Sequence, residues 1–138
     1  MSQRTLAILK PDCLMKKVQG KVIQQILDAG FDIKGMRLMQ LTKESAQKFY
    51  EVHKERPFYN DLVAYMTSGP VIPIALEKDN AVADFRKLIG ATNPANAEEG
   101  TIRKLYAESI EKNIVHGSDS PENAKNEIAH FFKDSDLV

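Results

Sequence analysis

The stretch TLAILKPDCLMKKVQGKVIQQILDAG, residues 5–30, contains the two kinds of element from which the fold is built. After Thr5 the chain is apolar as far as Leu9, as expected of a strand that is buried on both faces, and Pro11 limits its extension. Apolar residues then recur at helical spacing, and Gly30 stands where a left-handed cap would end the helix. The stretch therefore predicts a buried strand followed by an amphipathic helix.

Strands and helices continue to alternate along the rest of the chain. The patterns predict a strand at 31–41, helices beginning at Thr42 and Asn60, a strand at 71–77, a helix capped by Asn80, a loop at 90–101, a short helix from Ile102, a strand at 114–116 and a helix at about 121–133. The apolar phase of the second strand changes near Gly35, which predicts a bulge. Pro73 removes one donor from the third strand and predicts a sheet edge or a bulge there.

This order favours an α+β fold of the ferredoxin-like type, a four-stranded antiparallel sheet made of split βαβ units with helices on one face. A small doubly wound parallel sheet is the alternative. The first is preferred because four short strands are too few for helices to cover both faces. We see no repeat, low-complexity tract or linker, so residues 1–138 are expected to form a single domain.

Composition narrows the classes of partner. Nineteen basic and nineteen acidic residues cancel, so no global field favours a nucleic acid or an anionic membrane. The apolar run before Lys10 is too short for a signal-peptide core or a membrane span, which predicts an intracellular, cytoplasmic protein. The single cysteine, Cys13, is expected to be a small turn or core residue rather than a redox group.

The stretch NIVHGSDSPENAKNEIAHFF, residues 113–132, places His116 just before a turn and a helix that Ser120 can cap. Glu127 edges the buried face of that helix and can fold back to hold one ring nitrogen of His116. The other nitrogen would then be a nucleophile or a base. An ordinary solvated Glu127 and a non-catalytic His116 remain the alternatives. Gly117 and Ser118 favour the functional interpretation, since they allow close backbone approach and offer a hydroxyl.

Other polar residues are ambiguous one at a time. Lys10 would emerge at the rim of an apolar face or lie along the surface. Arg86 and Arg103 are each typical surface cations, but together with a histidine they could form a phosphate clamp. Phe58, in a turn, is more typical of a core residue than of an exposed stacking surface.

The stretch NIVHGSDS resembles the active-site motif of nucleoside diphosphate kinases. The blocks LKPD, YEVHKERPFY, YMTSGPV and GATNPANAEEGTIR and the helix that carries Glu127 occur in matching order, from about Arg4 to Phe132. The chain ends soon after the last helix, as in bacterial members. Departures from the usual pattern are Cys13 in place of glycine, Lys16-Lys17 in place of Arg-Gly, and Pro73 within a strand.

The resemblance implies an enzyme that transfers the terminal phosphoryl group from a nucleoside triphosphate, chiefly ATP, to nucleoside diphosphates by a ping-pong mechanism. It implies a phosphohistidine formed through Nδ1 of His116, with Glu127 and Ser118 orienting the ring and Tyr50 close to it. The residues that match nucleotide contacts of the family are Lys10, Phe58, Leu62, Arg86, Thr92, Arg103 and Asn113, with Ile110 near Phe58. His53 matches a contact that is present in some members only.

Further expectations follow from this resemblance. Magnesium would be carried by the nucleotide phosphates rather than by a protein cage, and subunits would assemble into homotetramers or homohexamers. Stacking on Phe58 would tolerate any base. A non-catalytic nucleotide-binding or protein-interaction module on the same fold is the main alternative. A hydrolase with Ser118 as nucleophile is less favoured because no Gly-x-Ser-x-Gly elbow surrounds it.

Overall fold

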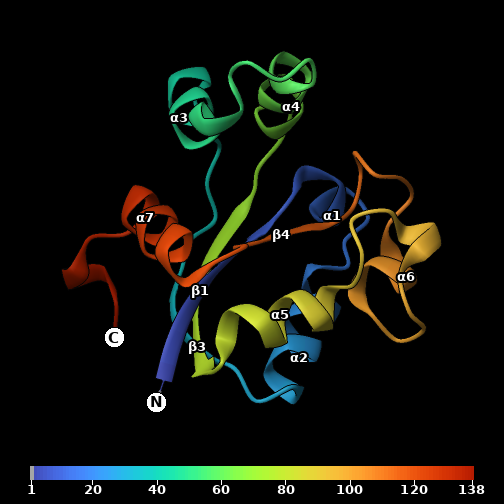
Figure 1. Cartoon of the computed structure of the whole chain (residues 1–138), viewed down its shortest axis with the longest axis vertical. Helices are drawn as coiled ribbons and strands as arrows, with labels where there is room; N and C mark the ends of the chain where they lie inside the picture. Colours follow the sequence, from blue (N-terminus) through green and yellow to red (C-terminus); the bar gives the residue numbers. More distant parts are fainter. Residues whose placement is uncertain (1) are drawn as a thin grey trace.

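The computed structural model describes residues 2–138 and arranges its strands in a four-stranded sheet (Figure 1). The strands are β1 (Ser2–Leu9), β2 (Asp32–Met36), β3 (Ile72–Asp79) and β4 (Val115–Gly117), in the spatial order β2-β3-β1-β4. All three neighbouring pairs are antiparallel. This topology confirms the predicted ferredoxin-like sheet and excludes the parallel alternative.

The helices are α1 (Pro11–Met15), α2 (Gln19–Asp28), α3 (Lys43–Phe49), α4 (Tyr59–Met66), α5 (Ala81–Ile89), α6 (Ile102–Tyr106) and α7 (Pro121–Phe131), with 3-10 segments at Glu51–His53, Pro94–Asn96 and Asp134–Asp136. The predicted caps of α3 and α7 are confirmed. Thr42 Oγ1 accepts a hydrogen bond from Ser45 N (3.1 Å), and Ser120 Oγ accepts one from Asn123 N (3.1 Å). Within residues 2–138, every helix is too short or too polar to cross a membrane.

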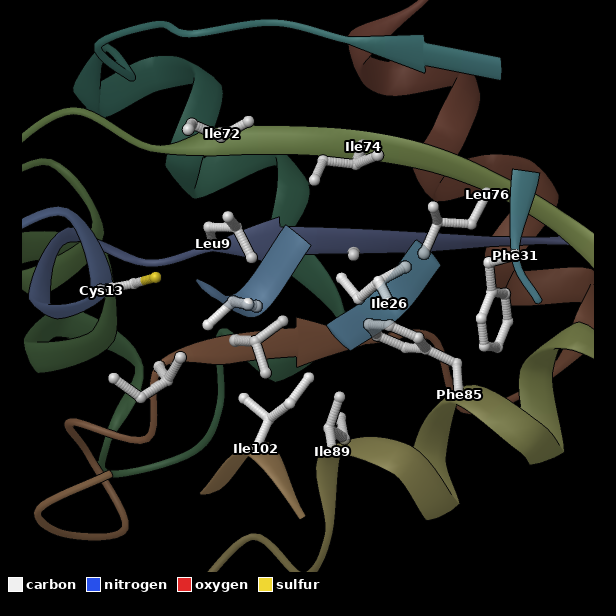
Figure 2. Close-up of a cluster of buried hydrophobic side chains, with 14 of the residues drawn as sticks. Leu9, Cys13, Ile26, Phe31, Ile72, Ile74, Leu76, Phe85, Ile89 and Ile102 are labelled. Carbon is white, nitrogen blue, oxygen red and sulfur yellow. The ribbon is translucent and has the colours of Figure 1, made fainter. Parts of the chain in front are cut away.

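Two buried clusters lie on opposite faces of the sheet. Ala7 and Leu9 of β1 face the cluster that includes Ile26 of α2 and Phe85 of α5 (Figure 2). Leu6 and Ile8 of β1 face the second cluster, formed with Tyr50 and residues of α4 and α7. The expectation that helices cover only one face is therefore wrong. The fully apolar run of β1 explains the difference, because successive side chains point to opposite faces and both faces need a cover.

Helix α1 was not predicted, and its end has an unusual conformation. Lys17 follows α1 with φ = 58°, in the left-handed region. Its N–H donates to Leu14 O (3.0 Å), and the next N–H, of Val18, donates to Cys13 O (3.2 Å). These are the two hydrogen bonds of a Schellman cap, in which the left-handed position is usually glycine. Cys13 is fully buried in the core, as expected of a small structural residue.

Pro73 lies in an interior strand, so the sheet-edge alternative is wrong, and the pairing of β1 with β3 continues through Pro73 without the alternative bulge. β3 is flanked by β1 and β2, and Pro73 is paired with Ile8 of β1. On its other side, Pro73 O accepts from Arg37 N (3.1 Å), one residue beyond the end of β2. Proline has no backbone N–H to donate on this side, and the loss is tolerated because β2 has already ended at Met36. The bulge predicted near Gly35 is confirmed by a register shift between Ile33 and Gly35.

Asn80 immediately precedes α5, at the N-cap position, but its side chain does not cap the helix. Its backbone is left-handed, with φ = 56°, a conformation that asparagine tolerates better than most residues. The side chain of Gln3 supplies the cap instead, since its Oε1 accepts from Val82 N (2.9 Å). The cap therefore comes from a residue 79 positions away, which local sequence does not reveal.

Candidate active site

The predicted site residues meet at one cleft of about 420 Å³. Its walls come from the end of β1, from α3, α4 and α5, and from β4 and α7. The predicted residues that line it are Lys10, Tyr50, His53, Phe58, Leu62, Arg86, Thr92, Arg103, Asn113, His116 and Glu127. Of the predicted catalytic residues, Ser118 is not in this lining and lies fully buried behind it.

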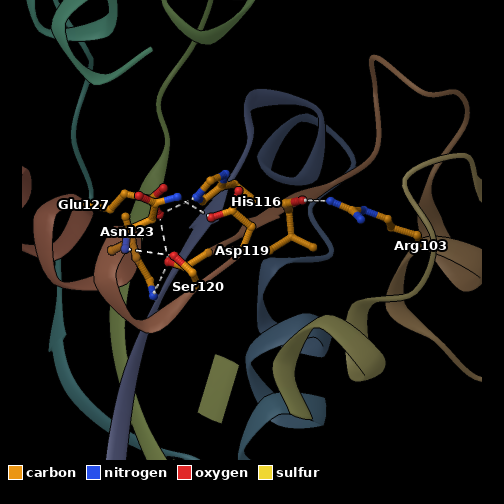
Figure 3. Close-up of polar contacts among 9 residues, drawn as sticks. Arg103, His116, Asp119, Ser120, Asn123 and Glu127 are labelled. Carbon is orange, nitrogen blue, oxygen red and sulfur yellow. Dashed lines mark hydrogen bonds and ion pairs between the residues drawn. The ribbon is translucent and has the colours of Figure 1, made fainter. Parts of the chain in front are cut away.

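Glu127 of α7 holds the imidazole of His116. The distance between His116 Nε2 and Glu127 Oε1 is 2.9 Å, and Figure 3 shows the two side chains pointing toward one another. Ser118 Oγ donates to the same carboxylate oxygen (2.7 Å) and accepts from Leu6 N (3.1 Å), which fixes the carboxylate to β1. An ionised carboxylate can only accept, so the proton of the His116 contact lies on Nε2. Nδ1 is then the ring nitrogen that carries a lone pair.

Close packing sets the position of His116. An added Cβ on Gly117 would lie 3.0 Å from Phe85 Cδ2 and 3.1 Å from Ile89 Cδ1 of α5, so only glycine lets β4 approach that helix so closely. On the other side, the ring of Phe49 makes an edge contact with the imidazole, with centroids 5.6 Å apart. A role for Phe49 was not predicted, because a single aromatic residue in the apolar stripe of a helix is typical of a core residue.

Tyr50 lies close to this pair and is almost fully buried. Among the described residues its hydroxyl has no hydrogen-bond partner. Burial and the charge of Glu127 raise the pKa of Tyr50 above its usual value, so the hydroxyl stays protonated. The hydroxyl of Tyr50 is therefore a neutral hydrogen-bond donor at the cleft that has no acceptor among the described residues.

Lys10 is buried rather than lying along the surface. It is 8% exposed, and its Nζ donates to Asn113 Oδ1 (2.7 Å). Burial and the positive charge of Arg103 lower the pKa of Lys10 to about 8. Asn113 is held at its other end as well, since its Nδ2 donates to Thr92 O (3.4 Å). Lys10, Asn113 and the 90–101 loop are thus linked at one end of the cleft.

Arg103 is also buried, although a surface position was the simpler expectation. Its guanidinium donates to three backbone carbonyls, those of Asn113 (3.3 Å), Gly90 (3.0 Å) and Val115 (2.7 Å). Burial and Arg86 lower the pKa of Arg103 to about 10. Arg86 itself is exposed at the cleft. The two arginines therefore differ: one braces the backbone beside His116, and the other faces solvent.

The outer end of the cleft is apolar. Phe58 is 48% exposed, so it is not the core residue that its turn position favoured, and its ring lies 5.6 Å from that of His53. An adjoining hollow of about 460 Å³ is lined by Phe58, Leu62, Tyr65 and Ile110, and also by Lys10 and Asn113. A flat apolar group with a polar attachment fits this combination of walls.

Asp12 was not predicted as a site residue, although it makes prominent contacts. Asp12 is 5% exposed and hydrogen-bonded to Tyr65 and to the backbone of Ile114. Its sequence context, a turn after a strand, is typical of exposed aspartates, and only its place in the LKPD block could have drawn attention to it.

In residues 2–138 no group of three or more His, Cys, Asp or Glu side chains could hold a metal ion.

Comparison with known proteins agrees with this geometry. Residues 3–137 match the family model described as nucleoside diphosphate kinase. The chain is 60% identical over 136 residues to a nucleoside diphosphate kinase of Chloroherpeton thalassium, covering 99% of this chain and 96% of that protein. It is 61% identical to that of Chlorobaculum tepidum, covering 99% and 97%.

Solved structures give the same result. The nucleoside diphosphate kinase of Aquifex aeolicus superposes with a TM-score of 0.98 at 39% identity, over 100% of both chains. The enzyme of Halobacterium salinarum, solved in complex with CDP, gives a TM-score of 0.95 at 34% identity, over 100% of this chain and 92% of that one. The chain belongs to the nucleoside diphosphate kinase family and is, by that membership, a phosphotransferase.

Proposed function

We propose that this enzyme transfers the terminal phosphoryl group of a nucleoside triphosphate, chiefly ATP, to nucleoside diphosphates through a phosphohistidine at Nδ1 of His116. One observation carries the proposal: Glu127 engages Nε2 at 2.9 Å within a cleft that also contains Lys10 and Arg86. Because the proton of the Glu127 contact lies on Nε2, Nδ1 carries the lone pair that can attack phosphorus.

The transfer has two balanced halves. The Nδ1 lone pair of His116 bonds to the γ-phosphorus of the triphosphate, and the bond from that phosphorus to the bridging oxygen breaks, releasing the diphosphate. A terminal oxygen of a second diphosphate then attacks the phosphorus, and the bond to nitrogen breaks. The ring keeps its Nε2 proton throughout, with Glu127 offsetting the positive charge that the phosphorylated ring carries.

Charge on the transferring oxygens would be stabilised by the cations of the cleft. Arg86 and Thr92 are exposed at the cleft and would meet an incoming phosphate, and Lys10, which donates to Asn113, would contact the phosphates as well. Arg103 uses one proton on each of its three nitrogens for backbone carbonyls, so its two remaining protons are those that can reach a phosphate oxygen. The hydroxyl of Tyr50, which has no partner among the described residues, would donate a hydrogen bond to a phosphate oxygen near His116.

The nucleoside would occupy the outer end. Phe58, Leu62 and Ile110 would contact the base, His53 would lie near it, and Lys10 and Asn113 would contact the sugar hydroxyls. Stacking does not distinguish one π-face from another, so we expect broad base specificity. The related enzyme of Halobacterium salinarum was solved with CDP, which supports a nucleoside diphosphate as ligand.

The remaining expectations accompany this proposal. Magnesium would arrive on the nucleotide, because the cleft carboxylate, Glu127, is already engaged with His116 and Ser118. We also propose one kinase domain over residues 1–138, a cytoplasmic location and assembly into a homotetramer or homohexamer. Light scattering on the purified protein would decide between the two assemblies.

The test is a chase of labelled phosphate. The protein is incubated with γ-labelled ATP and Mg²⁺ and then given GDP. We expect acid-labile, alkali-stable label on the protein that moves into GTP, and no label on His116→Ala. His130→Ala is the matched control, since His130 lies on α7 outside the cleft lining and should keep the label. Acid-stable label would point to Ser118, and loss of ATP without GTP formation would also rule the proposal out.

A further inference from the structure

The residue between Asn113 and Val115 has a strained backbone. Ile114 has φ = 75°, a region that β-branched residues rarely occupy, and it is fully buried. Val115 N donates to Asn113 O (2.8 Å), which closes a tight three-residue turn around Ile114. Such conformations are energetically unfavourable and persist only where their surroundings impose them. The surroundings of Ile114 therefore determine where Asn113 and His116 lie.

Both backbone groups of Ile114 are bound by the segment after β1. Ile114 N donates to Asp12 Oδ2 (3.0 Å), and Ile114 O accepts from Lys10 N (2.8 Å). Asp12 is 5% exposed, so its charge is balanced by hydrogen bonds rather than by water. The carboxylate of Asp12 is therefore the side-chain support of the strained turn.

Tyr65 fixes the other oxygen of that carboxylate. Its hydroxyl donates to Asp12 Oδ1 (2.5 Å) and accepts from Asp12 N (3.1 Å). Burial and Asp12 raise the pKa of Tyr65 above its usual value, so the hydroxyl remains a donor. Tyr65 lies on α4, which stands with α3 at one end of the molecule (Figure 1) and carries Leu62 of the apolar hollow.

We infer that Asp12, oriented by Tyr65, is a positioning residue that holds the Ile114 turn and so sets His116 and Asn113 against the same nucleotide. This inference rests on the proposed role of His116. Asp12 is absent from the lining of both the cleft and the apolar hollow, so it acts through its neighbours rather than by touching substrate. The three residues Asp12, Tyr65 and Ile114 are named the Asp12 clamp below.

Loss of the clamp should slow phosphoryl transfer more than it weakens nucleotide binding. Asn113 is still held by Lys10, Thr92 and Arg103 when Asp12 is changed. The Ile114 turn, in contrast, loses its side-chain support, and displacement of a nucleophile by about 1 Å can cost about 100-fold in rate. We expect about 10-fold slower labelling of His116 for Tyr65→Phe and about 100-fold for Asp12→Ala.

The experiment measures single-turnover labelling by γ-labelled ATP, nucleotide affinity by calorimetry, and thermal unfolding. Asp12→Asn should restore the rate to within about 3-fold of the original protein, because its amide can still accept from Ile114 N and bond to the Tyr65 hydroxyl. Tyr59→Phe is the matched control: it removes a hydroxyl from the same helix, one that bonds Gln47 O rather than Asp12. Its rate should not change.

The outcomes separate the two proposals. Failure of the unmodified protein to form labelled His116 would reject the proposed function itself. If the unmodified protein is labelled and Tyr65→Phe, Asp12→Ala and Tyr59→Phe all react at its rate while only their unfolding temperatures differ, the clamp is merely structural and the inference is wrong. Tyr65→Phe, which retains the carboxylate, decides the question if Asp12→Ala does not fold.

Discussion

Replacing Lys17 with glycine should make the protein more stable. Lys17 occupies the left-handed position of the cap after α1, with φ = 58°, and its side chain is exposed. A residue with a Cβ is disfavoured in this region by roughly 1–2 kcal/mol, whereas glycine enters it freely. Glycine also loses more chain entropy on folding, which removes about 0.4–1 kcal/mol of that gain. The expected net effect is a stabilisation of about 0.5–1 kcal/mol.

The assay is thermal unfolding at fixed protein concentration, where this gain corresponds to a rise of about 2–4 °C for a chain of this size. Lys21→Gly is the matched control, because Lys21 is an exposed lysine inside α2, where glycine costs about 1 kcal/mol. Lys17→Ala keeps the Cβ and should change little. Equal losses of stability for Lys17→Gly and Lys21→Gly would show that the backbone of Lys17 is not strained as described.

Three more predictions concern the site and the core. The pKa of Lys10 is lowered to about 8, and only its protonated ammonium attracts phosphate, so kcat/KM should fall as the pH rises through about 8. In a profile of kcat/KM against pH, Lys10→Arg should not show this fall. Burial raises the pKa of Cys13 to about 12, so a thiol-reactive dye should label it only after denaturation; rapid labelling of the native protein would contradict its burial. Gly117→Ala should lower the free energy of unfolding by about 1–3 kcal/mol and slow the phosphorylation of His116, because the added Cβ would lie 3.0 Å from Phe85. An unchanged free energy of unfolding in a denaturant titration and an unchanged rate of His116 labelling would refute this.

Local patterns predicted the elements well where the determining contacts are themselves local. The caps at Thr42 and Ser120 and the left-handed Gly30 are set by residues within one turn of the chain. The cap of α5 was predicted at Asn80, but it comes from Gln3 of β1. The prediction that helices cover only one face of the sheet failed for a different reason. It relied on the small number of strands and neglected the apolar run from Leu6 to Leu9, which requires a cover on both faces.

In the candidate site, too, contacts between residues close in sequence were predicted, whereas contacts between distant segments were not. The spacing of His116 and Glu127 across a turn and a helix predicted their contact, which the structure shows at 2.9 Å. Burial of Arg103 and the link between Asp12 and Tyr65 could not be predicted, because they depend on segments that meet only in the folded sheet. A single sequence reveals which charged residues are present but not which of them the fold places out of water.

The central position of β1 has a consequence for the order of folding. Of the four strands in the sheet, β1 is synthesised first, yet its partners are β3 and β4, and Ala7 pairs with Gly117, 110 residues later. Pairings of such sequence separation form slowly, because a long loop must close before they contribute. The apolar residues of β1 must therefore wait for most of the chain to emerge from the ribosome, a period in which aggregation competes with folding. β4 carries His116, so a nascent chain becomes competent for catalysis only when this last strand docks.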